Sequence, residues 1–118
     1  MSKNVVVYHN PRCSKSRAAV SLLQEKGIDF TEVHYLEIPI SACEVEGLAR
    51  ALGLKPLEFM RTGEKSFREL GLSKKDERPD SEWFQIMAEN PILIERPIVL
   101  KGGQARIGRP TEQILEVL

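Results

Sequence analysis

A run of β-branched residues that leads into a polar loop and a cysteine constrains the fold of this chain most strongly. Val5-Val6-Val7 is typical of a buried strand, and Asn10-Pro11 marks a turn just after it. Cys13-Ser14-Lys15-Ser16-Arg17 suits the first turn of a helix, where the hydroxyl of Ser14 or Ser16 can accept a hydrogen bond from a free backbone N–H. The pattern predicts a strand, a tight loop and a helix, with the cysteine at the helix N-terminus.

The predicted position of Cys13 favours a thiolate. Free backbone N–H groups and the helix dipole stabilise an anion there, and thiols in such settings have pKa values of about 3.5 to 7.5. Nearby basic residues add positive charge: His9, Arg12, Lys15 and Arg17. A structural cysteine would have apolar neighbours, so we interpret Cys13 as a nucleophile. Since Ser16 is the third residue after Cys13, the loop cannot close its own disulfide.

The composition indicates one globular domain over residues 1–118. Lysine plus arginine and aspartate plus glutamate number 17 each, which argues against a general nucleic-acid or membrane surface. No targeting segment and no apolar run long enough for a membrane span is visible. The two cysteines suit a reducing compartment better than a disulfide framework. We therefore expect a cytoplasmic protein with no nucleic-acid and no membrane partner.

Strand and helix patterns alternate at first and then give way to helices. A helix from about Lys15 to Gly27 and a strand over residues 30–36 complete a βαβ unit with parallel strands. Further helices are predicted at 41–53, begun by a capping box of Ser41 and Glu44, and at 55–61, 65–70 and 81–89. We expect these helices to form an insertion at about 41–90. Cys43 lies in an ordinary amphipathic helix, so we interpret it as structural or incidental.

The remaining residues predict a hairpin and a final helix. Pro97–Lys101 and Gln104–Gly108 read as strands joined by Gly102-Gly103, and Thr111 is expected to cap a helix with Ile114, Leu115 and Leu118 on its apolar face. A βαβ unit followed by a ββα unit is the thioredoxin-like α/β arrangement, with a mixed four-stranded sheet. In that fold a cis-proline opens the third strand, and Arg96-Pro97 occupies this place.

Two arginines bracket the predicted hairpin. Arg96 and Arg109 each precede a proline, and the sheet arrangement brings both toward the end where Cys13 lies. A guanidinium group binds a tetrahedral oxyanion well because its planar fork donates two parallel hydrogen bonds. The alternative is that each arginine is a surface charge or pairs with Glu95 or Glu112.

The chain resembles the glutaredoxin-dependent arsenate reductases along nearly its whole length, and within them the subgroup with a Cys-Ser-Lys-Ser loop. The resembling segments are Tyr8 to Arg17, Glu69 to Leu72, Asn90 to Val99, and Arg106 to Pro110. The resemblance implies that Cys13 attacks arsenate and that Arg61, Arg96 and Arg109 hold the oxyanion. It also implies glutathione as co-substrate and glutaredoxin as partner, which agrees with the monothiol loop.

We therefore expect reduction of arsenate, or of another small oxyanion, to proceed through a Cys13 adduct. His9 and Ser16 would help to hold the thiolate; no bound cofactor and no metal are expected. Two alternatives remain open. A non-enzymatic regulator similar to the Spx proteins, which bind RNA polymerase, would have a Cys-x-x-Cys switch where this chain has Ser16. A monothiol glutaredoxin-like protein would have a Cys-Gly-Phe-Ser loop.

Overall fold

The computed structural model describes residues 5–118, which form two compact units. The first unit comprises residues 5–38 and 96–118, and the second comprises Pro39–Glu95. The elements are β1 (Val5–Tyr8), α1 (Ser14–Glu25), β2 (Phe30–Val33), α2 (Ala42–Leu52), η1 (Pro56–Glu58), α3 (Lys65–Glu69), α4 (Asp80–Glu89), η2 (Pro91–Leu93), β3 (Ile98–Lys101), β4 (Gln104–Ile107) and η3 (Thr111–Val117), where η marks a 3-10 helix. None of the helices described in residues 5–118 is long and apolar enough to cross a membrane.

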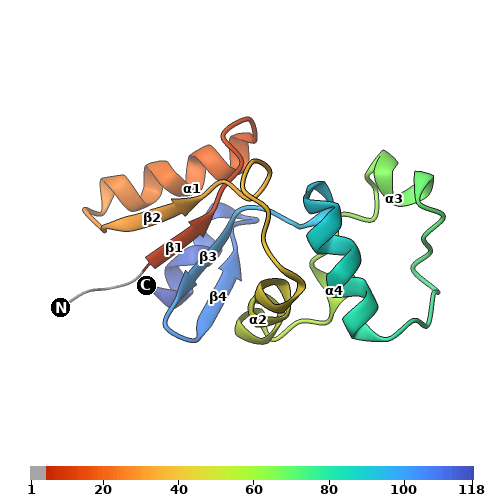
Figure 1. Cartoon of the computed structure of the whole chain (residues 1–118). Helices are drawn as coiled ribbons and strands as arrows, with labels where there is room; N and C mark the ends of the chain where they lie inside the picture. The colour runs from red at the N-terminus through yellow and green to blue at the C-terminus, as the bar shows by residue number, and fades with distance from the viewer. Residues whose placement is uncertain (1–4) are drawn as a thin grey trace. The chain divides into compact units, whose positions relative to one another are not determined.

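The first unit is built on one mixed sheet with strand order β2-β1-β3-β4, and Figure 1 shows β1 between β2 and β3. Strands β1 and β2 are parallel, with Val7 opposite Glu32, whereas β3 is antiparallel to both β1 and β4. The predicted α/β fold, a βαβ unit followed by a hairpin and a final helical turn, is confirmed. The peptide bond between Arg96 and Pro97 is cis, as expected for this fold, and the bond between Arg109 and Pro110 is cis as well.

The core of the first unit explains why these segments fold as they do. Side chains of β1 and β3 pack with α1 and η3 into one apolar cluster: Val5, Val7, Ala19, Leu23, Val99, Ile114 and Val117. The β-branched residues suit the pleated sheet, and the helix contributes residues one turn apart. The packing holds the amino end of α1 at the carboxyl end of β1, so it fixes the position of the loop between them.

The second unit is helical. Ser41 caps α2 by accepting a hydrogen bond from the backbone N–H of Glu44 at 3.1 Å, as predicted, and the helix ends at Gly53 with φ of 70°. Trp83 on α4 is buried and stacks on Phe67 of α3. The prediction that residues 41–90 form an insertion within a single domain stays a prediction.

Several predicted boundaries are wrong. The strand predicted over 30–36 ends at Val33, and the helix predicted over 55–61 is the short η1, after which Met60 forms a β-bridge with Ile94. The last segment is a 3-10 helix whose N-cap is Pro110, not Thr111. Because a 3-10 helix repeats every three residues, its buried side chains are Ile114 and Val117, while the predicted Leu115 is 39% exposed.

Candidate functional site

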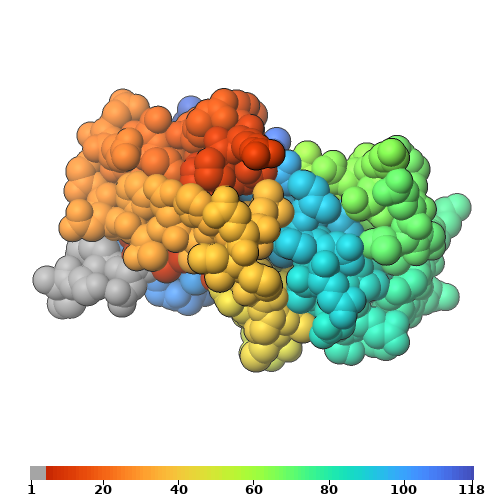
Figure 2. Space-filling view, turned by 45° about the horizontal axis from the view of Figure 1, so that its top comes forward, coloured from red at the N-terminus to blue at the C-terminus, as the bar shows by residue number. Residues whose placement is uncertain are grey.

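Cys13 lies at the junction of loop and helix, as the sequence predicts. It is the N-cap residue of α1, its backbone N–H donates to the carbonyl of Asn10 at 2.9 Å, and its carbonyl accepts from the N–H of Arg17 at 3.0 Å. The side chain is partly exposed, and the adjacent Pro11, Arg12, Ser14 and Lys15 are exposed. Figure 2 shows this segment, in red to orange, at the molecular surface. The thiol therefore sits in an accessible turn.

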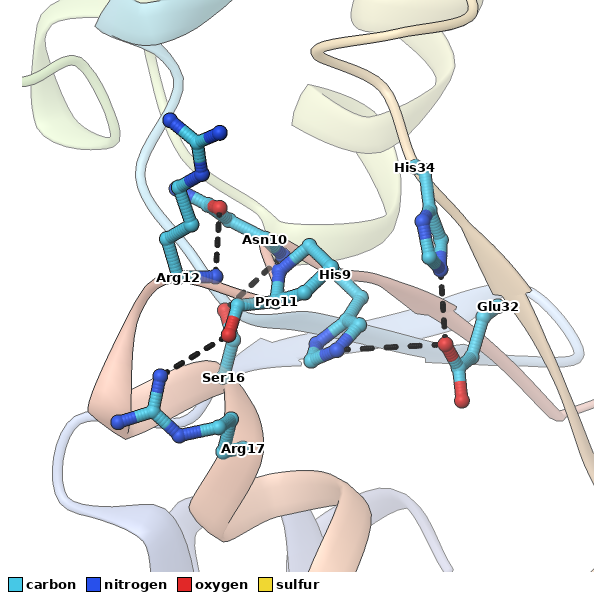
Figure 3. A network of polar contacts seen from close by, with 8 residues as sticks. All are labelled: His9, Asn10, Pro11, Arg12, Ser16, Arg17, Glu32 and His34. Atoms are coloured by element: carbon cyan, nitrogen blue, oxygen red, sulfur yellow. Dashed lines mark hydrogen bonds and ion pairs between the residues drawn. The ribbon is translucent and has the colours of Figure 1, made fainter.

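Polar contacts hold the turn together, and Figure 3 shows them. The side-chain oxygen of Asn10 accepts from the N–H of Arg12 at 3.0 Å, while the N–H of Asn10 donates to Ser16 Oγ at 3.3 Å. The expectation that Ser14 or Ser16 caps the first turn of the helix is wrong, since α1 has no side-chain cap. Ser16 is fully buried, so its hydroxyl contacts the preceding loop instead.

The surroundings of Cys13 favour its ionised form. Burial raises the pKa of the thiol, but hydrogen bonds from the backbone N–H groups of Ser16 and Lys15, and a hydrogen bond and the charge of Arg96, outweigh it and lower the pKa to about 7. At neutral pH a large fraction of Cys13 is therefore thiolate. The predicted helix N-terminal effect acts here through two particular amides.

Two arginines from the ends of the hairpin meet at the thiol. Arg109 Nη2 lies 3.7 Å from Cys13 Sγ, and Arg109 Nε donates to the carbonyl of Arg96 at 2.8 Å. Arg96 is buried, with 8% exposure, and its guanidinium contacts the sulfur. The structure thus brings together the predicted residues Cys13, Arg96 and Arg109. It creates a positively charged site directly beside the nucleophile.

A close backbone contact keeps the hairpin ends together. The N–H of Gly108 donates to the carbonyl of Pro97 at 2.9 Å, and a Cβ atom on Gly108 would lie 2.9 Å from Pro97 Cγ. Only a residue without a side chain fits there without displacing Pro97. Arg96 precedes Pro97 and Arg109 follows Gly108 in the sequence. The close contact at Gly108 therefore helps to determine where both arginines are held.

Arg61 belongs to the second unit. Its backbone N–H donates to the carbonyl of Leu93, and its Nη1 donates to Glu95 Oε1 at 3.1 Å. The carboxylate of Glu64 lies 4.0 Å from its Nε. The role of Arg61 in oxyanion binding stays a prediction, and the guanidinium is held by carboxylates of its own unit. Cys43, also in this unit, is a free and exposed thiol in the first turn of α2.

His9 is buried on the β2 side of the loop. Its Nε2 lies 4.0 Å from Glu32 Oε1, which also contacts His34 Nε2 at 2.8 Å. Burial lowers the pKa of His9; Glu32 opposes this effect, whereas His34 and Arg17 add to it. Sequence reasoning selected His9 but missed Glu32 and His34. The available signal was the parallel pairing of the two strands, which sets β2 beside the residue that follows β1.

The chain is similar to proteins of a known family. The model of the ArsC family matches residues 8–117. A protein of Escherichia coli, YfgD, is 45% identical over 119 residues, covering 100% of this chain and 99% of its own length. An arsenate reductase of Haemophilus influenzae is 41% identical and covers 98% of this chain and 99% of its own length. The solved structure of an arsenate reductase from Vibrio cholerae superposes with a TM-score of 0.94 at 46% identity, covering 100% of both chains.

Proposed function

Because this chain belongs to the ArsC family, we propose that it is a cytoplasmic reductase that converts arsenate to arsenite through Cys13. The observation that carries this proposal is the thiol with a pKa of about 7 beside the guanidinium group of Arg109, with Nη2 at 3.7 Å from Sγ. A nucleophile and a group that can bind an anion are thereby brought together from distant parts of the chain. Thiolate attack on a tetrahedral oxyanion needs this pair of features.

In the first step the Cys13 thiolate attacks the arsenic atom of a bound arsenate. A sulfur–arsenic bond forms, an arsenic–oxygen bond breaks, and the oxygen leaves as water after taking up protons. The oxidation state of arsenic does not change in this step. Arg96 and Arg109 neutralise the oxyanion and the additional negative charge of the transition state.

In the second step the thiolate of glutathione attacks the sulfur atom of Cys13. The sulfur–sulfur bond forms and the sulfur–arsenic bond breaks, leaving its electron pair on arsenic, which is thereby reduced from As(V) to As(III). Arsenite leaves, and Cys13 remains in a mixed disulfide with glutathione. A thiolate of glutaredoxin then attacks the glutathione sulfur and releases the Cys13 thiolate. A bound cofactor has no part in this cycle, since both electrons come from thiols.

The other predicted residues have supporting parts in this proposal. His9 and Ser16 hold the loop that presents the thiolate, and Arg61 supplies a third guanidinium to the oxyanion. The absence of a second thiol at residue 16 supports the use of an external reductant. Cys43 has no part in the cycle.

The test is oxidation of NADPH in a mixture of the protein, glutathione, glutathione reductase and glutaredoxin, with and without arsenate. We expect arsenate-dependent oxidation that Cys13→Ser abolishes, because a hydroxyl does not ionise near neutral pH. The matched control is Cys43→Ser, which should keep the rate.

Two outcomes would reject the proposal. A rate of NADPH oxidation that is equal with and without arsenate would show that arsenate is not a substrate. The description of the Cys13 site would not depend on that result. Equal losses from Cys13→Ser and Cys43→Ser would mean that Cys43 takes part as a second redox thiol.

A further inference from the structure

The loop before Cys13 and the segment that follows β2 lie side by side in the first unit. The backbone N–H of His9 donates to the carbonyl of Val33 at 2.9 Å. A pocket of about 310 Å³ opens between the two segments, and its lining residues are His9, Asn10, Pro11, Arg12, His34, Leu36 and Glu37. Figure 2 shows both segments on one face, the thiol loop in red and the residues after β2 in light orange. The surface beside the thiol is therefore hollowed.

The segment after β2 presents apolar side chains at this hollow. Leu36 is 38% exposed and Ile38 is 66% exposed, and they are two of the four exposed large hydrophobic side chains in residues 5–118. A turn holds the segment, since the N–H groups of Glu37 and Ile38 donate to the carbonyl of His34 at 3.0 and 2.9 Å. Exposed large apolar side chains grouped beside a pocket are typical of a surface that binds another protein.

The segment around Cys13 presents positive charge on the same face. Arg12, Lys15 and Arg17 are exposed, and within residues 5–118 none of the three forms an ion pair. Arg17 donates to the carbonyl of Pro11 at 2.9 Å and stays charged. Glu37 is the only carboxylate among the residues that line the pocket. The face therefore has an excess of positive charge, which favours a partner with acidic residues.

The position of Cys13 limits how another protein can reach it. Arg109 Nη2 lies 3.7 Å from the sulfur, on the side of the hairpin. Strand order β2-β1-β3-β4 puts the hairpin on one side of β1 and the segment after β2 on the other. Thiol–disulfide exchange brings three sulfur atoms into contact, so a protein that attacks a disulfide at Cys13 must rest on the residues around it. The β2 side offers such a protein a pocket, apolar side chains and cations.

We propose that the pocket and its rim are the docking surface for the protein that reduces the mixed disulfide at Cys13. We define the docking surface by Pro11, Arg12, Lys15, Leu36 and Ile38. The partner is a thiol reductant of the glutaredoxin kind, with apolar and acidic residues around its own cysteine. An apolar side chain of the partner fills the pocket, and its acidic residues face Arg12 and Lys15. The inference rests on the proposed function in one respect, namely that glutaredoxin resolves the mixed disulfide with glutathione.

The reaction at this docking surface is a thiol–disulfide exchange. The thiolate of the partner attacks the glutathione sulfur, a new sulfur–sulfur bond forms between them, and the bond to Cys13 breaks. Cys13 leaves with the electron pair as a thiolate. The groups that lower the pKa of Cys13 are the backbone N–H groups of Ser16 and Lys15 and the side chain of Arg96, and no side chain of the docking surface is among them. Changing these side chains should therefore affect the protein partner and not the chemistry of the thiol.

The test compares a protein reductant with a small one. The Cys43→Ser protein is first converted to the Cys13–glutathione mixed disulfide with oxidised glutathione. Its reduction by glutaredoxin or by dithiothreitol is then followed by mass spectrometry in a single turnover. We expect Leu36→Ser to lower the rate constant with glutaredoxin about fivefold or more and to leave that with dithiothreitol unchanged. The matched control is Leu115→Ser, because Leu115 is 39% exposed in the same unit but lies on η3.

The charge of the docking surface is tested by salt. The rate constant with glutaredoxin should fall as sodium chloride is added, and Lys15→Gln should lower it about threefold at low salt and weaken its salt dependence. Lys26→Gln, at the other end of α1, is the matched control. Dithiothreitol carries no net charge, so its rate constant should be equal in all of these proteins.

The possible failures are distinguishable. Equal glutaredoxin rate constants for Leu36→Ser and Leu115→Ser would reject the docking surface and leave glutaredoxin as the reductant. Equal losses with glutaredoxin and dithiothreitol in Leu36→Ser would mean that the substitution disturbs Cys13 itself, which would also reject the docking role. A mixed disulfide that glutaredoxin reduces no faster than dithiothreitol does, at equal thiol concentration, would reject both the partner and the docking surface. Because the mixture contains no arsenate, failure of arsenate reduction does not affect these results.

Discussion

Arg109 Nη2 lies 3.7 Å from Cys13 Sγ, although 96 positions separate the two residues in the chain. The contact exists because β3 and β4 bring the far end of the hairpin to the carboxyl end of β1. A guanidinium at this distance favours the thiolate, and its positive charge also attracts an anion to the space beside the sulfur. The same cation therefore prepares the nucleophile and attracts the molecule that the nucleophile attacks.

Replacing Arg109 by lysine should impair arsenate reduction although the charge is kept. An ammonium group cannot donate two parallel hydrogen bonds, so we expect a loss of about 10- to 100-fold in kcat/KM, the equivalent of one charged hydrogen bond of ~1.5–3 kcal/mol. The matched control is Arg106→Lys, because Arg106 lies on β4 of the same hairpin and pairs with Glu116 of η3 at 2.8 Å. The measurement is kcat/KM for arsenate in the two variants. A larger loss in Arg106→Lys than in Arg109→Lys would mean that the oxyanion role had been assigned to the wrong arginine.

A bound oxyanion should reduce the reactivity of Cys13. The thiol pKa of about 7 depends on Arg96, whose charge a sulfate ion would neutralise while placing negative charge beside the sulfur. Both effects disfavour the thiolate, so the pKa should rise, by about one unit, and alkylation near neutral pH should slow. The measurement is the iodoacetamide rate of the Cys43→Ser variant from pH 4 to 10, with sulfate or with sodium chloride at equal ionic strength. A midpoint that sulfate does not move would argue against an anion site at the thiol.

Ser16→Ala should destabilise the fold more than it affects the thiol. The substitution leaves the buried N–H of Asn10 without the acceptor it has at 3.3 Å, which should cost about 1–3 kcal/mol. The backbone N–H of residue 16, which lowers the thiol pKa, remains. Urea unfolding should therefore show the loss, with the exposed Ser14→Ala as a near-neutral control. A rise of the alkylation midpoint in Ser16→Ala would instead indicate that the hydroxyl itself stabilises the thiolate.

Gly108→Ala should disturb both stability and the arginine pair. The new Cβ would lie 2.9 Å from Pro97 Cγ and 3.3 Å from Ile114 Cγ2, so Pro97 or the final helix must shift, at a cost of about 1–3 kcal/mol. A shift of Pro97 would also move Arg96, which precedes it and which lowers the pKa of Cys13. We therefore expect the thiol pKa to rise in this variant. Gly103→Ala in the hairpin turn meets no atom within 4 Å and should change the free energy of unfolding by less than about 0.5 kcal/mol. Equal unfolding midpoints for the two variants would contradict this account.

The sheet and the place of Cys13 could be predicted because local patterns determine them. The valines of β1 and the glycine turn between β3 and β4 each indicate one backbone conformation, and the chirality of a βαβ unit leaves a single way to join the first two strands. Arg96 and Arg109 could be placed near the thiol for the same reason, since the hairpin carries them to a known end of the sheet.

The direction of individual side chains could not be predicted in the same way. Ser16 carries a good capping group, but its position on the buried face of α1 directs the hydroxyl to Asn10. Glu32 looks like an exposed strand residue, and its contacts with His9 and His34 depend on a register that spacing alone does not fix. Thr111 is a good capping residue, but Pro110 occupies the N-cap and the segment winds as a 3-10 helix. Competition between nearby backbone and side-chain partners decides each of these cases.

The first unit is assembled from two separate stretches of chain, residues 5–38 and 96–118. During synthesis on the ribosome, Cys13 therefore emerges well before Arg96 and Arg109, with all of Pro39–Glu95 made in between. Until the hairpin has emerged, β1 lacks its β3 neighbour and the thiol lacks both guanidinium groups. In the growing polypeptide, Cys13 therefore lacks the two arginines that favour its thiolate. Its full reactivity toward anions arises only when β3 and β4 join the sheet.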